Sequence, residues 1–338
     1  MRNTYYPIDL TIYNLQTIVW AQLVGKLDRL PHALLIHGAP GIGKLALAER
    51  FAQLLLCEKK KQGAAPCGAC EGCRWLLAGN HPDARIVEPE AVALALGRPA
   101  TAAEEGDEEG PKEKKKPSVQ IRIEQTRGLA GFLNLASHRG GRRVAIIHPA
   151  EDMNAATANS LLKALEEPPA GAIFLLVSHR PAGLLPTIRS RCVPVPVPLP
   201  EATAAAAWLA KKGVRTPERW LAFAGGAPLR ALDYATGERG EAIERVLKAI
   251  ASGNRAALGE VKDRGELEPL AEVLQKMALD RAFTSLAGRS KYGGTAVAGD
   301  ARAWLAYARA MGRNRALTRH PLNPKLFAAE MVAGMPGI

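Results

Sequence analysis

The chain of 338 residues is long enough for two or three domains with ordinary buried cores. None of its apolar runs reaches the ~18 residues that a bilayer-spanning helix requires, and its first residues lack the basic-then-apolar order of a secretory signal. We therefore expect a cytoplasmic protein with no membrane partner. The formal charge of +12 favours a polyanion such as DNA as a neighbour, with a solvated basic surface as the alternative.

The first part of the chain, residues 1–196, is expected to form an α/β domain. Residues 33–37 (ALLIH) indicate a short buried strand, followed by a glycine-rich turn and a helix over 45–56. Further apolar segments predict strands at 84–87, 143–147, 173–177 and 193–197, with helical patterns such as 154–166 between them. Because strands alternate with helices, the sheet is predicted to be mostly parallel.

The turn after the first strand, GAPGIGKL, nearly matches a phosphate-binding loop. Gly38, Gly43 and Lys44 satisfy the pattern G-x-x-x-x-G-K-[ST], in which backbone N–H groups and the lysine hold phosphates. Leu45 occupies the position whose hydroxyl would bind Mg²⁺, and a leucine side chain has no oxygen to offer.

The strand at 143–147 should end in the carboxylates that bind Mg²⁺ and activate water, but the chain continues with His148 and Pro149. Glu151 and Asp152 lie further along and are the alternative carboxylates. We therefore expect no Mg²⁺-dependent ATP hydrolysis. Weak nucleotide or phosphate binding without Mg²⁺ stays open, and the alternative is a loop that only turns the chain.

Four of the five cysteines lie in the short segment 57–73. In a cytosolic chain this crowding argues for a metal site and against disulfides. Four thiolates from one loop can close a tetrahedral Zn²⁺ site, which leaves no open position for catalysis and therefore has a structural role. Reduced thiols without metal and an iron–sulfur cluster are the alternatives. The predicted ligands are Cys57, Cys67, Cys70 and Cys73.

The segment 95–118 is expected to interrupt the α/β domain as a flexible charged insertion. It contains the run TAAEEGDEEGPKEKKKP and few large apolar residues, so it cannot bury enough surface to order itself. A basic arm that touches DNA is the alternative interpretation.

Beyond residue 200 the sequence predicts only helices. Short helical stretches are expected at 201–212, 217–224 and 228–235, and longer amphipathic ones at 241–251, 267–286, 300–311 and 324–332. The first group predicts a small helical domain over 197–239, and the second an all-α domain over 240–338.

Besides the cysteine-rich segment, five further segments are distinctive: RLPHALLIHGAPGIGK at 29–44, HPD at 81–83, NAATANSLLKALEEPP at 154–169, FLLVSHRPAGLLPTIRSRC at 174–192 and AGGAPLRAL at 224–232. Together they resemble the delta-prime subunits of the bacterial DNA polymerase III clamp loader, a family of AAA+ proteins. The resemblance covers most of residues 1–239 and is looser in the helical tail, which includes LNPKL at 322–326.

This resemblance implies an AAA+ α/β domain (1–196), a helical lid (197–239) and a helical collar domain (240–338) that joins subunits into a ring. It implies delta and tau/gamma subunits as partners in the polymerase holoenzyme, where the ring opens the sliding clamp and places it on primed DNA. The delta-prime member is the rigid stator of that ring, and its own nucleotide site is inactive.

The resemblance also implies roles for single residues. Ser190, Arg191 and Cys192 match the family's Ser-Arg-Cys motif, in which the arginine reaches the ATP of a neighbouring tau/gamma subunit as an arginine finger. A planar, permanently charged guanidinium suits that role, because it can stabilise charge on the transferring phosphoryl group. Arg189 is close enough to be a rival, and an ordinary salt bridge is the alternative role for Arg191.

Two further positions match nucleotide-contacting residues of active relatives. Arg230 corresponds to an arginine of the lid and Ser178 to a sensor of the γ-phosphate, and both are expected to be vestigial here. An active tau/gamma-type ATPase and an independent zinc-stapled DNA-binding module are the two rival functions. Leu45, His148 and Pro149 oppose the first, because active relatives carry a hydroxyl and an Asp-Glu pair at these places.

Overall fold

The computed structural model describes residues 10–59, 65–98, 117–135, 137–138, 141–292, 300–318 and 320–336. The chain divides into two compact units, Met1–Leu199 and Pro200–Ile338. No helix among the described residues has the length and apolarity to cross a membrane. Most of the predicted charged insertion, residues 99–116, lies outside the described part of the chain.

The first unit contains a five-stranded sheet in which all pairs are parallel and the order is β2-β3-β4-β1-β5. This confirms the predicted α/β fold, and all predicted strands are present. They are β1 (Ala33–His37), β2 (Ala84–Val87), β3 (Arg143–Ile147), β4 (Ala172–Ser178) and β5 (Val193–Pro196). The central strands β1, β3 and β4 are almost continuous apolar runs, as expected for strands that are covered on both faces.

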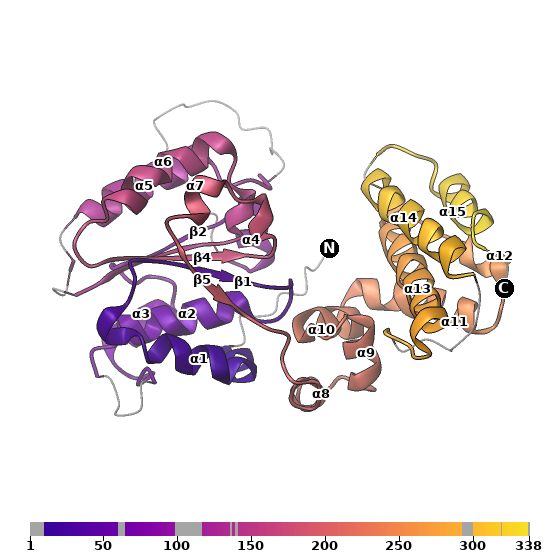
Figure 1. Cartoon of the computed structure of the whole chain (residues 1–338), viewed down its shortest axis with the longest axis horizontal. Coiled ribbons are helices and arrows are strands. Elements are labelled where there is room, and N and C mark those ends of the chain that lie inside the picture. Colours follow the sequence, from indigo (N-terminus) through magenta and orange to yellow (C-terminus); the bar gives the residue numbers. More distant parts are fainter. Residues whose placement is uncertain are drawn as a thin grey trace. The chain divides into compact units, whose positions relative to one another are not determined.

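Helices cover both faces of this sheet, with α1, α2 and α3 on one side and α5, α6 and α7 on the other (Figure 1). The first three span Thr17–Val24, Lys44–Leu55 and Glu71–Leu77, and the second three span Ile123–Asn134, Ala155–Glu166 and Pro186–Arg189. A short helix α4 (Glu90–Ala95) follows β2. A 3₁₀ helix over Leu10–Gln16 leads into α1, and the sequence had given no sign of this amino-terminal structure.

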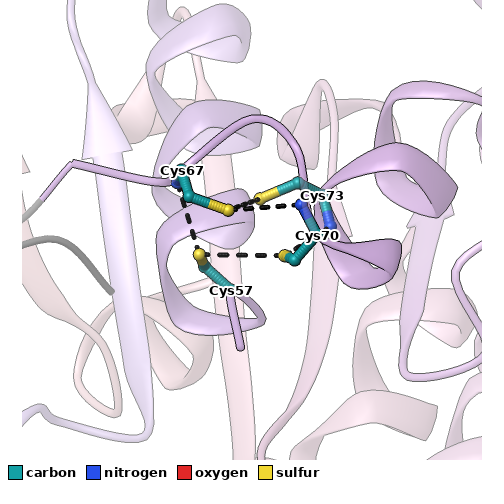
Figure 2. Close-up of side chains that lie close together, drawn as sticks. All are labelled: Cys57, Cys67, Cys70 and Cys73. Carbon is teal, nitrogen blue, oxygen red and sulfur yellow. Dashed lines mark hydrogen bonds between the residues drawn. The ribbon is translucent and has the colours of Figure 1, made fainter. Parts of the chain in front are cut away.

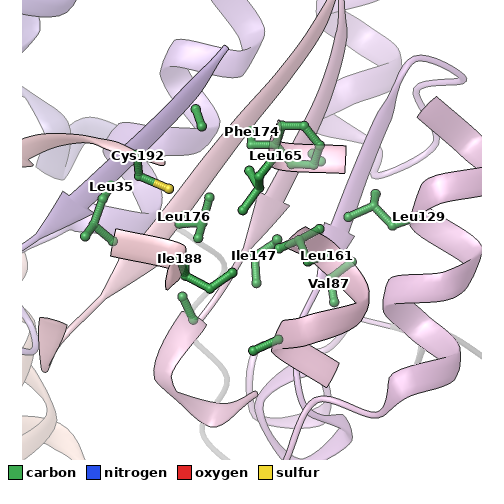
Figure 3. Packing of buried hydrophobic residues seen from close by; sticks show 14 of the residues in the cluster. Leu35, Val87, Leu129, Ile147, Leu161, Leu165, Phe174, Leu176, Ile188 and Cys192 are labelled. Carbon is green, nitrogen blue, oxygen red and sulfur yellow. The ribbon is translucent and has the colours of Figure 1, made fainter. Parts of the chain in front are cut away.

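One face of the sheet forms a hydrophobic core with α5, α6 and α7 (Figure 3). Strand side chains on this face pack against apolar residues of the three helices and against Cys192. This packing fixes the helices against the sheet. The labelled members are Leu35, Val87, Leu129, Ile147, Leu161, Leu165, Phe174, Leu176, Ile188 and Cys192.

The strand register places three loops at one edge of the sheet. His37, the last residue of β1, pairs with Ser178, the last residue of β4. Ile147 at the end of β3 pairs with Leu176. The segments that leave β1, β3 and β4 therefore emerge together at the carboxyl edge, where α/β proteins bind ligands.

The described residues of the second unit form helices and no strands, as predicted. It contains α8 (Ala202–Lys211), α9 (Pro217–Phe223), α10 (Pro228–Thr236), α11 (Glu238–Ala251), α12 (Arg255–Leu258), α13 (Leu267–Ala287), α14 (Ala301–Leu317) and α15 (Pro324–Ala333). The helices α11 to α15 contribute to one core, and α14 continues to Leu317 rather than ending at the predicted residue 311. The predicted boundary between lid and collar stays a prediction, and it falls within the first turn of α11.

Candidate functional site

The glycine-rich turn after β1 has the backbone of a tight strand-to-helix loop. Gly43 adopts φ +88° directly before α2, in the left-handed region that favours glycine. A Cβ atom at Gly38 would collide with the carbonyl oxygen of Val197, so only glycine fits there. The structure therefore places both predicted glycines where the loop requires them, next to the amino terminus of a twelve-residue helix.

The lysine of this loop is bound to the loop itself. Lys44 is 2% exposed, and its Nζ donates to the carbonyl oxygens of Gly38 at 2.9 Å and of Ala39 at 2.6 Å. Burial lowers the pKa of Lys44 to about 8, while the charge of Glu151 acts in the opposite direction. A phosphate at this position would have to draw the ammonium group away from two carbonyl acceptors.

The amino-terminal 3₁₀ helix packs against the same loop. The buried Gln16 donates from Nε2 to the carbonyl oxygens of Ile42 at 3.1 Å and of Pro198 at 3.3 Å. The side chain of Ile12, also buried, lies against Gly43. These contacts fix the loop from outside, and no motif in the sequence pointed to them.

His148, His179 and the carboxylate of Glu151 lie at the carboxyl edge of β3 and β4, and a histidine occupies the position directly after β3 where a magnesium site would have a carboxylate. His148 follows β3 and is 8% exposed, and its ring meets that of His179 edge-on with centroids 5.4 Å apart. The Oε1 atom of Glu151 accepts a hydrogen bond from the backbone N–H of His179 at 2.9 Å. Ser178 is fully buried, and its hydroxyl accepts from the backbone N–H of Arg180 at 3.1 Å.

The two histidines are neutral at physiological pH. Burial, reinforced by the neighbouring His179, lowers the pKa of His148 to about 3, and burial also lowers the pKa of His179 to about 4. Imidazole is a poor ligand for Mg²⁺. Leu45 at the start of α2 and His148 after β3 offer no oxygen at the two positions where a working loop of this type carries its magnesium ligands. Glu151, whose charge acts on Lys44, is a carboxylate at this edge of the sheet.

The predicted Ser-Arg-Cys motif lies at the end of α7. Ser190 is exposed, and its Oγ donates to the carbonyl oxygen of Thr187 at 3.1 Å. Arg191 is one third exposed and pairs with the carboxylate of Glu166, the last residue of α6. Its Nη1 also donates to Thr187 O at 2.9 Å. Sequence reasoning had missed the contact with Glu166.

Cys192 and Arg189 differ from Arg191 in burial and in ion pairing. Cys192 is buried in the core between the sheet and α7, and burial raises its pKa to about 11. It is therefore a packing residue that anchors the motif. Arg189, the rival of Arg191, is exposed, and the described residues include no ion-pair partner for it.

The predicted cysteine ligands converge on one point (Figure 2). Cys57 follows α2, Cys70 caps the amino terminus of α3, and Cys73 lies within that helix. The four Sγ atoms lie within 4.8 Å of one another, and the Cys57–Cys70 and Cys67–Cys73 pairs are each separated by 3.9 Å. A tetrahedral site with Zn–S bonds of ~2.3 Å has sulfur–sulfur edges of about 3.8 Å, so this donor set fits zinc.

Backbone hydrogen bonds prepare the cluster for negative charge. The N–H groups of Ala69 and Cys70 point to the Sγ of Cys67 at 3.5 and 3.3 Å, and these two bonds lower the pKa of Cys67 to about 6. Burial raises the pKa of Cys73, so a thiolate there requires a cation beside it.

The lid arginine Arg230 lies in the second unit. Its Nη2 forms an ion pair with Glu272 of α13 at 2.9 Å, and Glu272 is only 1% exposed. Tyr234 also donates to this carboxylate, and Lys276 pairs with it at 2.9 Å. Arg230 is thus engaged in an ion pair with a neighbouring helix of its own unit, and its expected vestigial character as a nucleotide-contacting residue stays a prediction.

The comparisons with known proteins agree with one family. The model of the family described as "DNA polymerase III, delta subunit" matches residues 16–200, more than half of the chain. The DNA polymerase III subunit delta' of Pseudomonas aeruginosa is 38% identical over 276 residues, which cover 80% of this chain and 74% of that protein. The DNA polymerase III subunit tau of Salmonella typhimurium is 32% identical over 168 residues, 50% of this chain and 22% of that protein.

Among solved structures, a DNA polymerase III gamma subunit-related protein from Thermotoga maritima aligns with 95% of this chain and 97% of its own, at 17% identity and a TM-score of 0.42. The family model and the extent of identity to delta' decide the assignment. The chain belongs to the family of DNA polymerase III delta' subunits.

Proposed function

We propose that this chain is a non-hydrolysing stator of the DNA polymerase III clamp loader. The observation that carries the proposal is a contrast between two sites in the same domain. The nucleotide loop keeps its glycines and lysine but has Leu45 and His148 in place of its magnesium ligands. The Ser-Arg-Cys motif, by contrast, is complete, and Arg191 lies at the surface on a buried anchor, Cys192.

Arg191 is the group that acts on a partner. Supplied to the ATP of a tau/gamma neighbour, its guanidinium would neutralise charge that develops on the transferring phosphoryl group. An arginine keeps its charge at any physiological pH and presents a planar fork that matches phosphate oxygens. Hydrolysis by the neighbour would then depend on how that neighbour docks against this chain.

Family membership supports the delta and tau/gamma subunits of the loader as partners of this chain. The sliding clamp and primed DNA would be reached through the assembled ring in the cytoplasm. The similarity to tau over half of this chain is consistent with subunits that share an ancestral α/β domain. The helices of 240–338 would form the collar contacts.

The four-cysteine cluster would hold a structural Zn²⁺. Its ligands would be Cys57, Cys67, Cys70 and Cys73, and the bound ion would supply the positive charge that buried thiolates need. The metal would fix the segment between α2 and α3 against the α/β domain, with no part in hydrolysis.

Reconstitution with delta and tau/gamma subunits tests the function. We expect Arg191→Ala to enter the complex normally and to slow hydrolysis at the one site it serves by at least about tenfold, since in-trans arginines contribute strongly to phosphoryl transfer. A pre-steady-state phosphate burst measures this as lost amplitude. The exposed Arg189→Ala is the matched control and should keep the full burst.

Two results would contradict the proposal. An unchanged burst with Arg191→Ala would remove the role of the arginine. Multiple Mg²⁺-dependent turnovers by the purified chain alone would show that the site beside Leu45 is an active ATPase.

A further inference from the structure

The side chain of Arg191 is held by its own subunit. Its Nη2 pairs with the carboxylate of Glu166, while its Nη1 donates to Thr187 O at 2.9 Å and to Ser190 Oγ at 3.3 Å. Glu166 ends α6 and Arg191 follows α7, so two neighbouring helices of the same unit bring the opposite charges together. In this state the guanidinium has a negative partner already.

The ion pair is weak enough to exchange. The side chains of Arg191 and Glu166 are 32% and 48% exposed, and water screens such pairs strongly. A triphosphate carries several negative charges and accepts paired hydrogen bonds from a guanidinium, so it competes well against one exposed carboxylate. The other two acceptors of Arg191, Thr187 O and Ser190 Oγ, are neutral. They therefore do not compete electrostatically with the triphosphate for the guanidinium.

We propose that Glu166 is a positioning residue that holds Arg191 back until a nucleotide-bearing neighbour displaces it. The inference rests on the proposed role of Arg191 as an arginine finger. While Glu166 is paired with it, the guanidinium is neutralised and folded against its own subunit. Docking of the partner's triphosphate exchanges one anion for another, so the arginine is released only in a correctly assembled ring.

The chain supplies a matched control in the next residue. Glu167 is also exposed and carries the same charge, and the structure records no ion pair for it among the described residues. Replacing either glutamate by glutamine removes one negative charge from the same surface. Only Glu166→Gln removes the partner of Arg191.

The first measurement uses the purified chain and does not depend on ATP hydrolysis. Phenylglyoxal modifies guanidinium groups, and mass spectrometry gives the rate at each arginine. We expect Arg191 to react more slowly than the exposed Arg189, and Glu166→Gln to raise the rate at Arg191 by about two- to fivefold, as for loss of an exposed ion pair. Glu167→Gln should leave the Arg191 rate unchanged; an equal rate in wild type and Glu166→Gln overturns the inference.

The second measurement uses the complex with delta and tau/gamma. Glu166→Gln should lower the apparent KM for ATP by about two- to fivefold relative to Glu167→Gln, because the arginine no longer has to leave a competing anion. In the double variant Glu166→Gln with Arg191→Ala, the apparent KM for ATP should no longer be lowered by the loss of Glu166. If Glu166→Gln and Glu167→Gln give the same KM, the holding role is wrong although the finger stands.

These outcomes separate the two proposals. Loss of the phosphate burst in Arg191→Ala supports the finger whatever Glu166 does. If Arg191→Ala leaves hydrolysis unchanged, the proposed function fails, and the labelling experiment still decides whether Glu166 shields Arg191.

Discussion

Arg230 of α10 and the buried Glu272 of α13 form an ion pair at 2.9 Å that joins two helices of the second unit. Burial by itself would raise the pKa of Glu272, but Lys276 and the hydrogen bond from Tyr234 outweigh it and lower this pKa to about 2. The carboxylate is therefore charged at neutral pH. The arginine that matches a nucleotide contact in active relatives here compensates a buried charge.

Removing the charge of Glu272 should destabilise the second unit. Glu272→Gln leaves the cations around it without their shared carboxylate, and breaking a buried charge network on one side costs about 3–5 kcal/mol. Hydrogen exchange should show faster opening of α10 and α13. Glu268→Gln is the control, since Glu268 is 37% exposed and its loss should cost under about 1 kcal/mol. Equal protection in both variants would contradict a supporting role for Glu272.

The cysteine cluster predicts about one bound zinc ion per chain. Cys73→Ser should abolish stoichiometric metal and lower the melting temperature, because the buried thiolate is a ligand that serine replaces poorly. Elemental analysis of protein purified without chelator gives the metal content. Cys192→Ser is the control: that cysteine lies in the sheet core, so this variant should keep its zinc even if its packing suffers. Metal-free wild-type protein would refute the assignment.

Restoring a single magnesium ligand should not create an ATPase. In Leu45→Thr the hydroxyl returns, but His148 still stands at the end of β3 and Lys44 is still bound to the loop carbonyls. Phosphate release by the purified variant should therefore stay at background with Mg²⁺ present. The double variant with His148→Asp supplies both oxygens and should bind Mg²⁺-nucleotide more tightly than either single variant. Sustained turnover by Leu45→Thr alone would show that the missing carboxylate is dispensable.

Acid should destabilise the first unit through its buried histidines. An unfolded histidine, with a pKa of about 6.5, binds a proton as pH falls, whereas burial lowers the pKa of folded His148 to about 3. The unfolded state then binds more protons, so stability rises with pH between the two values and falls on acidification. For such a group the loss reaches about 2 kcal/mol at pH 5.

His148→Phe tests this pH dependence. The variant keeps an aromatic ring but cannot be protonated, so its unfolding free energy should decline less between pH 7 and pH 5 than that of the wild type. Urea unfolding at several pH values gives the slope, and the difference at pH 8 reports the packing effect alone. Parallel wild-type and variant curves would show that His148 does not contribute.

Long apolar runs made the sheet predictable. Residues of β1, β3 and β4 are apolar on both faces, and this pattern is present in the sequence before any folding. The helix boundaries shifted by a few residues, because end residues contribute little to periodicity. The amino-terminal 3₁₀ helix was missed, since its burial depends on the loop that it covers.

The amino-acid sequence by itself determined the order of strands and helices and the clustering of four cysteines. It also determined the absence of magnesium ligands at Leu45 and His148. Each of these features depends only on residue type and local spacing. Only the tertiary structure decided that Lys44 binds its own loop carbonyls, that Arg191 pairs with Glu166 and that Arg230 pairs with Glu272. The two ion pairs join residues that are 25 and 42 positions apart. Which opposite charges pair depends on their distance and burial in the folded chain, and a local sequence pattern does not determine either quantity.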